Sequence, residues 1–171
     1  MMLQVMFEHA IGFLTCAELC AEATESRKIR FDLLGTPEIV NLAFACEVYI
    51  KTLLKFYRIK VKKEHKLNEL LALLPDDEQY EIKQQTFQKH PVYNYSTGKI
   101  LTNGFGLDLL DLEANDFVDW RYLYEFKRCS YSCDVGFLRA FAVTLRDVCC
   151  ERLFRMSWEE YCKANKIYLD L

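Results

Sequence analysis

The sequence predicts an all-α fold, an up-and-down bundle of four to five main helices with short extra helices. Only 6 glycines and 3 prolines occur in 171 residues, too few for the many turns of an all-β sandwich or barrel. Hydrophobic residues make up 51% of the chain, which excludes intrinsic disorder and is enough for a core without metals or disulfides. Apolar residues also recur at steps of three and four over long stretches. The length favours one domain over residues 1–171.

The first two helices are expected to meet at a glycine. The first covers residues 2–33, and Gly35 is expected to end it. Thr36 and Pro37 then begin the second helix, because threonine can cap an N-terminus and proline is favoured at the first helical position. Apolar spacing continues from there to Tyr57. The apolar stripe of the first helix consists of Leu3, Phe7, Ala10, Leu14, Ala17, Ala21, Thr24 and Phe31.

Further helices follow in the second half of the chain. Pro75 separates a short helix from the next one, and Ser157 begins a terminal helix because Ser157 and Glu160 have the spacing of a capping box. The glycines, asparagines and proline within 90–105 predict a long loop or a small hairpin. The expected helices cover residues 66–74, 76–89, 107–124 and 137–153, with a short one from 157.

Charge and hydropathy limit the classes of partner. The formal net charge is −3 and the pI is about 5.7, so the whole chain has no general attraction to nucleic acid. The longest stretches without a charged residue, 9–17 and 90–98, have nine residues, whereas a membrane-spanning helix needs about 20 apolar residues. We therefore expect no membrane contact, no signal peptide and a cytoplasmic protein.

The eight cysteines are expected to be reduced thiols, and most of them lie in apolar helical patterns, where a free cysteine packs as a small hydrophobic side chain. A zinc site is the alternative, because Cys16/Cys20 and Cys129/Cys133 each have an i, i+4 spacing that facing helices could bring together. That spacing differs from the usual C-x2-C pair, so we predict no metal. No phosphate-loop or dinucleotide motif occurs, and we predict no cofactor.

Three short segments carry a resemblance to a known superfamily. Residues 42–54, LAFACEVYIKTLL, resemble the A-x-E-x-x-x-K-x-L-L run in the second helix of HEPN proteins. Residues 65–71, HKLNELL, resemble the H-x-L-x-x-L element that follows it, and Trp120-Arg121-Tyr122 resembles the R-Y element before the last helix. The resemblance implies a HEPN-like helical domain, of a kind that is often dimeric and frequent in bacterial toxin–antitoxin and phage-defence systems.

The catalytic motif of the family is not at its usual place. Many HEPN proteins cleave RNA without metal through an R-x4–6-H motif in the C-terminal half. No histidine follows His90 in this chain, and the one R-x6-H sequence, Arg58 to His65, lies between the second and third helices. The resemblance therefore implies the HEPN architecture without the standard ribonuclease activity.

His65 is the candidate acid/base group, because histidine titrates near neutral pH. Arg58 or Arg121 would stabilise the charge that develops on the phosphate. The alternative is that His65 caps the helix over 66–74 or packs beneath the preceding loop.

A basic stretch is the candidate binding surface for RNA or a nucleotide. It has seven cations against Glu64 alone, and such density attracts phosphates, although most charge runs are solvated faces. Among these cations we take Lys51, Lys55, Lys62 and Lys63 as binding residues. The cations are Lys51, Lys55, Arg58, Lys60, Lys62, Lys63 and Lys66.

Glu47 and an aromatic cluster complete the candidate residues. Glu47 stands four residues before Lys51, which predicts a helix ion pair, or it turns inward and meets Arg121. Trp120 and Tyr122 flank Arg121 and could contact a partner, or form an aromatic core layer.

Two functions follow from these residues. The first is a HEPN-like domain that binds RNA, a nucleotide or a protein partner such as a cognate antitoxin, and that self-associates as a homodimer. The second is a metal-independent endoribonuclease that uses His65 with Arg58 or Arg121.

Overall fold

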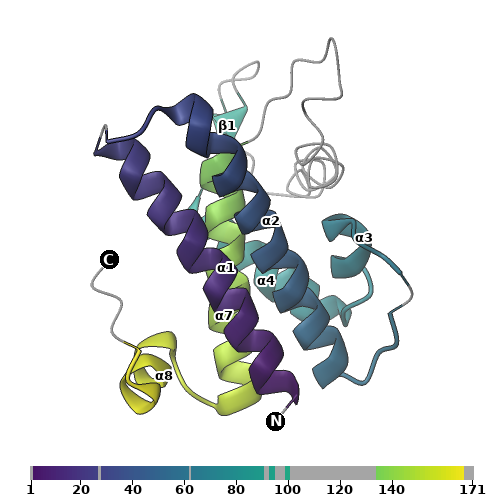
Figure 1. Cartoon of the computed structure of the whole chain (residues 1–171). Helices are drawn as coiled ribbons and strands as arrows, with labels where there is room; N and C mark the ends of the chain where they lie inside the picture. Colours follow the sequence, from purple (N-terminus) through teal and green to yellow (C-terminus); the bar gives the residue numbers. More distant parts are fainter. Residues whose placement is uncertain are drawn as a thin grey trace.

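The all-α fold is confirmed (Figure 1). A computed structural model of the chain describes residues 2–26, 28–61, 63–90, 93–94, 99–100 and 134–167. Two short strands pair as an antiparallel hairpin, with Tyr93 opposite Ile100. The elements are α1 (Met2–Glu25), α2 (Phe31–Phe56), α3 (Leu67–Leu71), α4 (Asp76–Lys89), β1 (Tyr93–Asn94), β2 (Lys99–Ile100), α7 (Val135–Phe154) and α8 (Trp158–Asn165).

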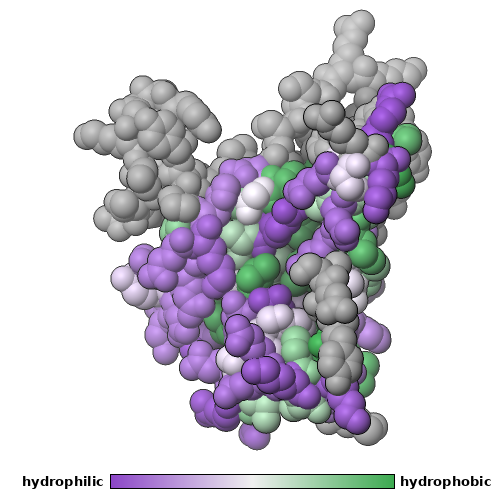
Figure 2. Space-filling model, turned by 90° about the vertical axis from the view of Figure 1, so that its left-hand side faces the viewer, coloured by the Kyte–Doolittle hydropathy of each residue, from purple (hydrophilic) through white to green (hydrophobic). Residues whose placement is uncertain are grey.

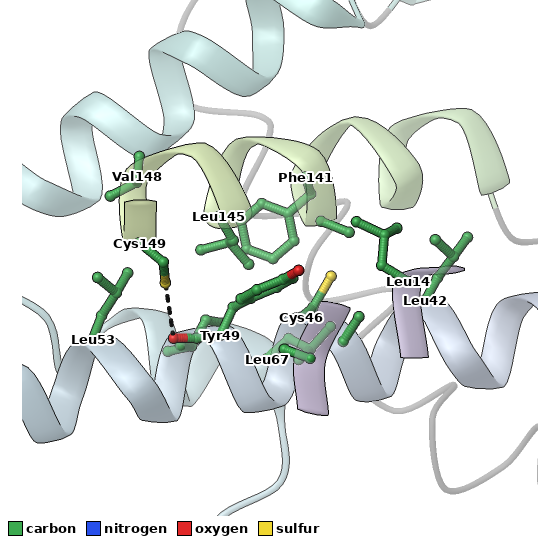
Figure 3. Packing of buried hydrophobic residues seen from close by; sticks show 14 of the residues in the cluster. Leu14, Leu42, Cys46, Tyr49, Leu53, Leu67, Phe141, Leu145, Val148 and Cys149 are labelled. Carbon is green, nitrogen blue, oxygen red and sulfur yellow. Dashed lines mark hydrogen bonds between the residues drawn. The ribbon is translucent and has the colours of Figure 1, made fainter. Parts of the chain in front are cut away.

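Helix α2 lies at the centre of the bundle, packed against α1 and α7, while α4 packs against α7. Figure 3 shows Cys46, Tyr49 and Leu53 of α2 directed toward α7. The thiol of Cys149 donates a 3.7 Å hydrogen bond to the carbonyl of Tyr49. Burial raises the pKa of the Cys149 thiol and raises that of Cys150 to about 12, so both stay neutral core side chains. The prediction that these cysteines pack in the core is confirmed.

Two of the predicted helices form where local sequence signals are strongest. Helix α4 begins at Asp76, where acidic residues fill the first turn, and ends at Lys89. At the N-terminus of α8, the Ser157 and Glu160 side chains each bond the backbone N–H of the other, and the capping box is confirmed. The hairpin strands lie within the segment expected to be a loop or small hairpin, whereas the helix expected over 107–124 lies outside the described residues.

The predicted boundary between the first two helices is wrong. Helix α1 ends at Glu25, and α2 begins at Phe31, so that Gly35 and Pro37 lie inside α2. The last buried residue of α1 is Ala21, and none of the described residues in the charged segment after it, 22–26 and 28–30, is buried. Pro37 lies early in α2, where it removes one helical hydrogen bond, and its own carbonyl accepts a 2.8 Å bond from the Asn41 amide.

Buried ion pairs join the helices at two levels. Glu38 of α2, 4% exposed, accepts a hydrogen bond from Arg139 of α7. Glu78 of α4, 3% exposed, accepts bonds from Arg152 of α7 at 3.1 Å and from the Tyr57 hydroxyl at 2.6 Å. A buried carboxylate needs a cationic or hydrogen-bonding partner. Because the partner arginines lie on α7, both pairs connect helices that are distant in sequence.

Hydrophilic residues cover much of the described surface on the face shown in Figure 2, with smaller hydrophobic areas between them. None of the described helices combines the length and the apolar character that a bilayer-spanning segment requires.

Candidate functional site

Glu47 connects two of the predicted site residues. It lies on α2 and is only 6% exposed. Its Oε1 accepts a 2.7 Å hydrogen bond from Lys51 Nζ and lies 2.9 Å from His65 Nδ1. Its Oε2 is buried, without a hydrogen-bond partner among the described residues. The predicted ion pair with Lys51 is therefore present, and Glu47 also turns inward.

The Glu64 carboxylate holds the backbone of the two residues that follow it. The Glu64 carboxylate accepts hydrogen bonds from the N–H groups of His65 and Lys66, at 2.8 and 2.9 Å. These two backbone bonds lower the pKa of Glu64. The residue at the N-cap of α3 is Lys66, which makes no side-chain capping bond, so the interpretation of His65 as the helix cap is wrong.

The His65 imidazole contacts Glu47 through one of its two ring nitrogens. With an ionised carboxylate, which only accepts hydrogen bonds, this contact requires a proton on Nδ1, and Nε2 of the neutral ring then carries the lone pair. The side chain as a whole is 57% exposed.

Helix α2 ends in a left-handed turn that carries Arg58. Arg58 has a φ of 59°, and its N–H donates to the Lys55 carbonyl at 3.0 Å, while Ile59 N–H donates to the Leu54 carbonyl at 2.8 Å. These two bonds form a Schellman motif, which satisfies the last carbonyls of the helix with backbone donors. The side chains of Lys55 and Arg58 are therefore not needed as helix caps.

A cleft lies beside this turn, with a volume of about 470 Å³. Among the described residues, no carboxylate lines it, although Lys51 on its wall is paired with Glu47. Lys55 Nζ contacts the Met2 sulfur, and within the described ranges Arg58 and Lys60 form no ion pair. We call it the basic cleft. Its lining residues are Lys51, Lys55, Arg58, Ile59, Lys60 and Val61.

The structure brings some of the predicted residues together and separates others. Lys51, Lys55 and Arg58 line the basic cleft, and Lys51 links it through Glu47 to His65. In the part of the chain that is described, no hydrogen bond joins Arg58 to His65. Lys63 is exposed in the loop. Lys62, Trp120, Arg121 and Tyr122 lie outside the described residues, as do Cys129 and Cys133.

Sequence reasoning missed the apolar wall of the cleft. Ile59 and Val61 alternate with Lys60 in the segment after α2, and both β-branched side chains pack partly against the core. The available signal was the run Ile59-Lys60-Val61, in which apolar residues stand directly beside a cation.

A second cavity of about 800 Å³ lies by the C-terminal part of α7 and the start of α8. Arg146 lies 4.3 Å over the Trp158 ring there and donates two hydrogen bonds to Asp147. Acidic and basic side chains are mixed in its lining, so it has no preference for one sign of charge. Among the described residues, no three His, Cys, Asp or Glu side chains gather in a way that could hold a metal ion.

The comparisons with known proteins found no family model that matches this chain, and no similar curated protein or solved structure.

Proposed function

We propose that this chain is a HEPN-like helical protein of bacterial defence or toxin–antitoxin type that binds RNA or a nucleotide through the basic cleft. The observation that carries the proposal is the lining of the cleft, to which the described residues contribute four cationic side chains and no carboxylate. The helical bundle and the Glu47–Lys51 pair, within the segment that resembles the second HEPN helix, support the family assignment.

The arrangement of the cations favours a phosphate ligand. Arg58 presents a planar fork that matches two phosphate oxygens, while the lysines act as point charges. Ile59 and Val61 give the same cleft an apolar wall that a ribose or a base can contact. Because the net charge of the whole chain is −3, attraction to a polyanion is a local property of this cleft.

Fluorescence anisotropy with a labelled single-stranded RNA tests the proposal. The double variant Lys55→Glu/Arg58→Glu reverses two charges in the cleft and is expected to abolish binding. The matched control, Lys28→Glu/Lys163→Glu, changes the net charge equally at exposed positions outside the cleft and is expected to bind nearly as well as the wild type. Because the contacts to phosphate are ionic, the affinity of the wild type is expected to fall as the salt concentration rises. Equal loss of binding in both variants would refute the cleft as the site.

A second function is favoured by the Glu47–His65 contact. A carboxylate at Nδ1 orients the ring and leaves Nε2 as a general base, the role required in a metal-independent endoribonuclease. Nε2 would take the proton of a ribose 2′-hydroxyl, the 2′-oxygen would bond to phosphorus, and the bond to the 5′-oxygen would break as that oxygen gains a proton from water. The imidazolium would then return its proton to water. Arg58 or Arg121 would stabilise the phosphorane.

Incubation of labelled RNA in EDTA with the wild type and with His65→Ala distinguishes the two functions. Cleavage to a 2′,3′-cyclic phosphate that is lost in the variant supports the ribonuclease. Binding without cleavage at any protein concentration supports a binding protein alone.

A further inference from the structure

The charge in the basic cleft exceeds what one internal nucleotide can balance. Its volume of about 470 Å³ is at the lower end of the range for small-molecule pockets, about 300–1,000 Å³, so we expect it to hold one nucleotide at a time. Four cations of the described chain line it, and the Glu47 carboxylate balances Lys51. Three positive charges remain, whereas an internal nucleotide carries one negative charge on its phosphodiester.

The cations also converge on one place. Lys51 and Lys55 are four residues apart on one face of α2, Arg58 is in the turn that ends the helix, and Lys60 follows it. A surface that tracks a continuous strand instead has cations in a row, spaced like the phosphates along it. Convergent cations suit a single group of high charge.

The left-handed conformation of Arg58 agrees with this assignment. Glycine is the residue that such a C-terminal turn favours, because a β-carbon is strained there. Arg58 occupies the position although backbone donors already satisfy the helix end, so its guanidinium is available for an anion.

We propose that the basic cleft accepts a terminal phosphate, the phosphomonoester at the end of an RNA or on a free nucleotide. Such a group carries about −1.5 to −2 charges at pH 7 and three acceptor oxygens, enough for Arg58 and two lysines together. The inference rests on the proposed binding of RNA or a nucleotide, and it specifies which phosphate is recognised.

Three RNA oligonucleotides of one sequence test this, with a 5′-phosphate, a 3′-phosphate or hydroxyls at both ends, each labelled internally. The full-length protein is expected to bind one phosphorylated form about tenfold more tightly than the hydroxyl form. Arg58→Ala and, separately, Lys55→Ala are expected to remove this preference, while Lys28→Glu/Lys163→Glu keeps it. Lys55 and Arg58 are both exposed, and they are replaced separately so that misfolding of one variant does not decide the result.

A nucleoside monophosphate, with the nucleoside as control, identifies the source of the phosphate. Displacement of the RNA by the monophosphate alone points to a free nucleotide, and no displacement points to an RNA end. Equal affinity for all three oligonucleotides would overturn this inference and leave the RNA-binding function in place. Absence of binding to every probe would overturn both.

Discussion

Replacing Arg58 by glycine is expected to stabilise the fold and weaken phosphate binding at the same time. The left-handed conformation, with a φ of 59°, costs a residue with a β-carbon about 1–2 kcal/mol. Glycine removes this strain, but its greater freedom in the unfolded chain subtracts about 0.4–1 kcal/mol. The expected net gain in the free energy of unfolding is about 0.5–1 kcal/mol, which corresponds to about 1–4 °C in Tm for a chain of 171 residues.

Urea unfolding followed by circular dichroism measures the change in stability, and Arg58→Ala is the matched control. Alanine keeps the β-carbon and its strain but lacks the guanidinium. We expect the alanine variant to unfold within about 0.5 kcal/mol of the wild type. Both variants should lose affinity for a terminal phosphate to the same extent. A glycine variant no more stable than the alanine variant would show that the turn is not strained and would remove one support for the site.

Three further outcomes are expected in unfolding experiments. Arg152→Met should lower the free energy of unfolding by about 3 kcal/mol, because Glu78 stays buried without its cation; a loss below 1 kcal/mol would contradict this. Gly136→Ala should cost about 1 kcal/mol, since its β-carbon would lie 2.8 Å from His90 Cε1, and the cost should be smaller in a His90→Ala background, where the contact at 3.3 Å with Asp134 Oδ1 remains. Burial, with the hydrogen bond to Glu78, raises the pKa of Tyr57 to about 12, so the native state holds this proton more tightly than the unfolded chain. The resulting stabilisation is complete below about pH 10 and is lost between about pH 10 and 12, so Tyr57→Phe should flatten the stability profile there.

The elements with local signals could be predicted from the sequence. The acidic first turn at Asp76 and the capping box at Ser157 begin helices α4 and α8, because both act within one turn of the chain. The end of α1 could not be predicted in the same way. Apolar spacing continues through Phe31, and Pro37 is typical of a first helical turn, although the packing of α2 against α1 places the break at 26–30.

In the site, too, contacts within one helix could be predicted from the sequence, whereas contacts between distant segments could not. The ion pair between Glu47 and Lys51 follows from their i, i+4 spacing on one helix. The contact between Glu47 and His65 spans 18 residues and depends on how the segment after α2 returns along that helix. No spacing rule predicts such a return. The left-handed turn at Arg58 had no sequence signal either, because glycine is the residue typical of it.

Glu47 differs from the other two buried glutamates of the described chain in what it connects. Glu38 and Glu78 pair with arginines of α7, so each joins two helices of the core. The partners of Glu47 are Lys51 on its own helix and His65 in a loop. Its pairs hold no helices together, and their effect is to orient Lys51, which lines the basic cleft, and His65 in the loop.

The variant Glu47→Gln tests whether Glu47 affects phosphate binding by orienting its partners or only through its negative charge. It should lower the free energy of unfolding by less than about 1 kcal/mol, because His65 and Lys51 can both regain water, whereas Glu78→Gln should cost more. Removal of a negative charge beside the cleft would by itself raise the affinity for a phosphate. We expect the affinity to fall instead, because Lys51, which lines the cleft, loses its fixed position. An increase in affinity would show that Glu47 acts on the cleft through its charge alone.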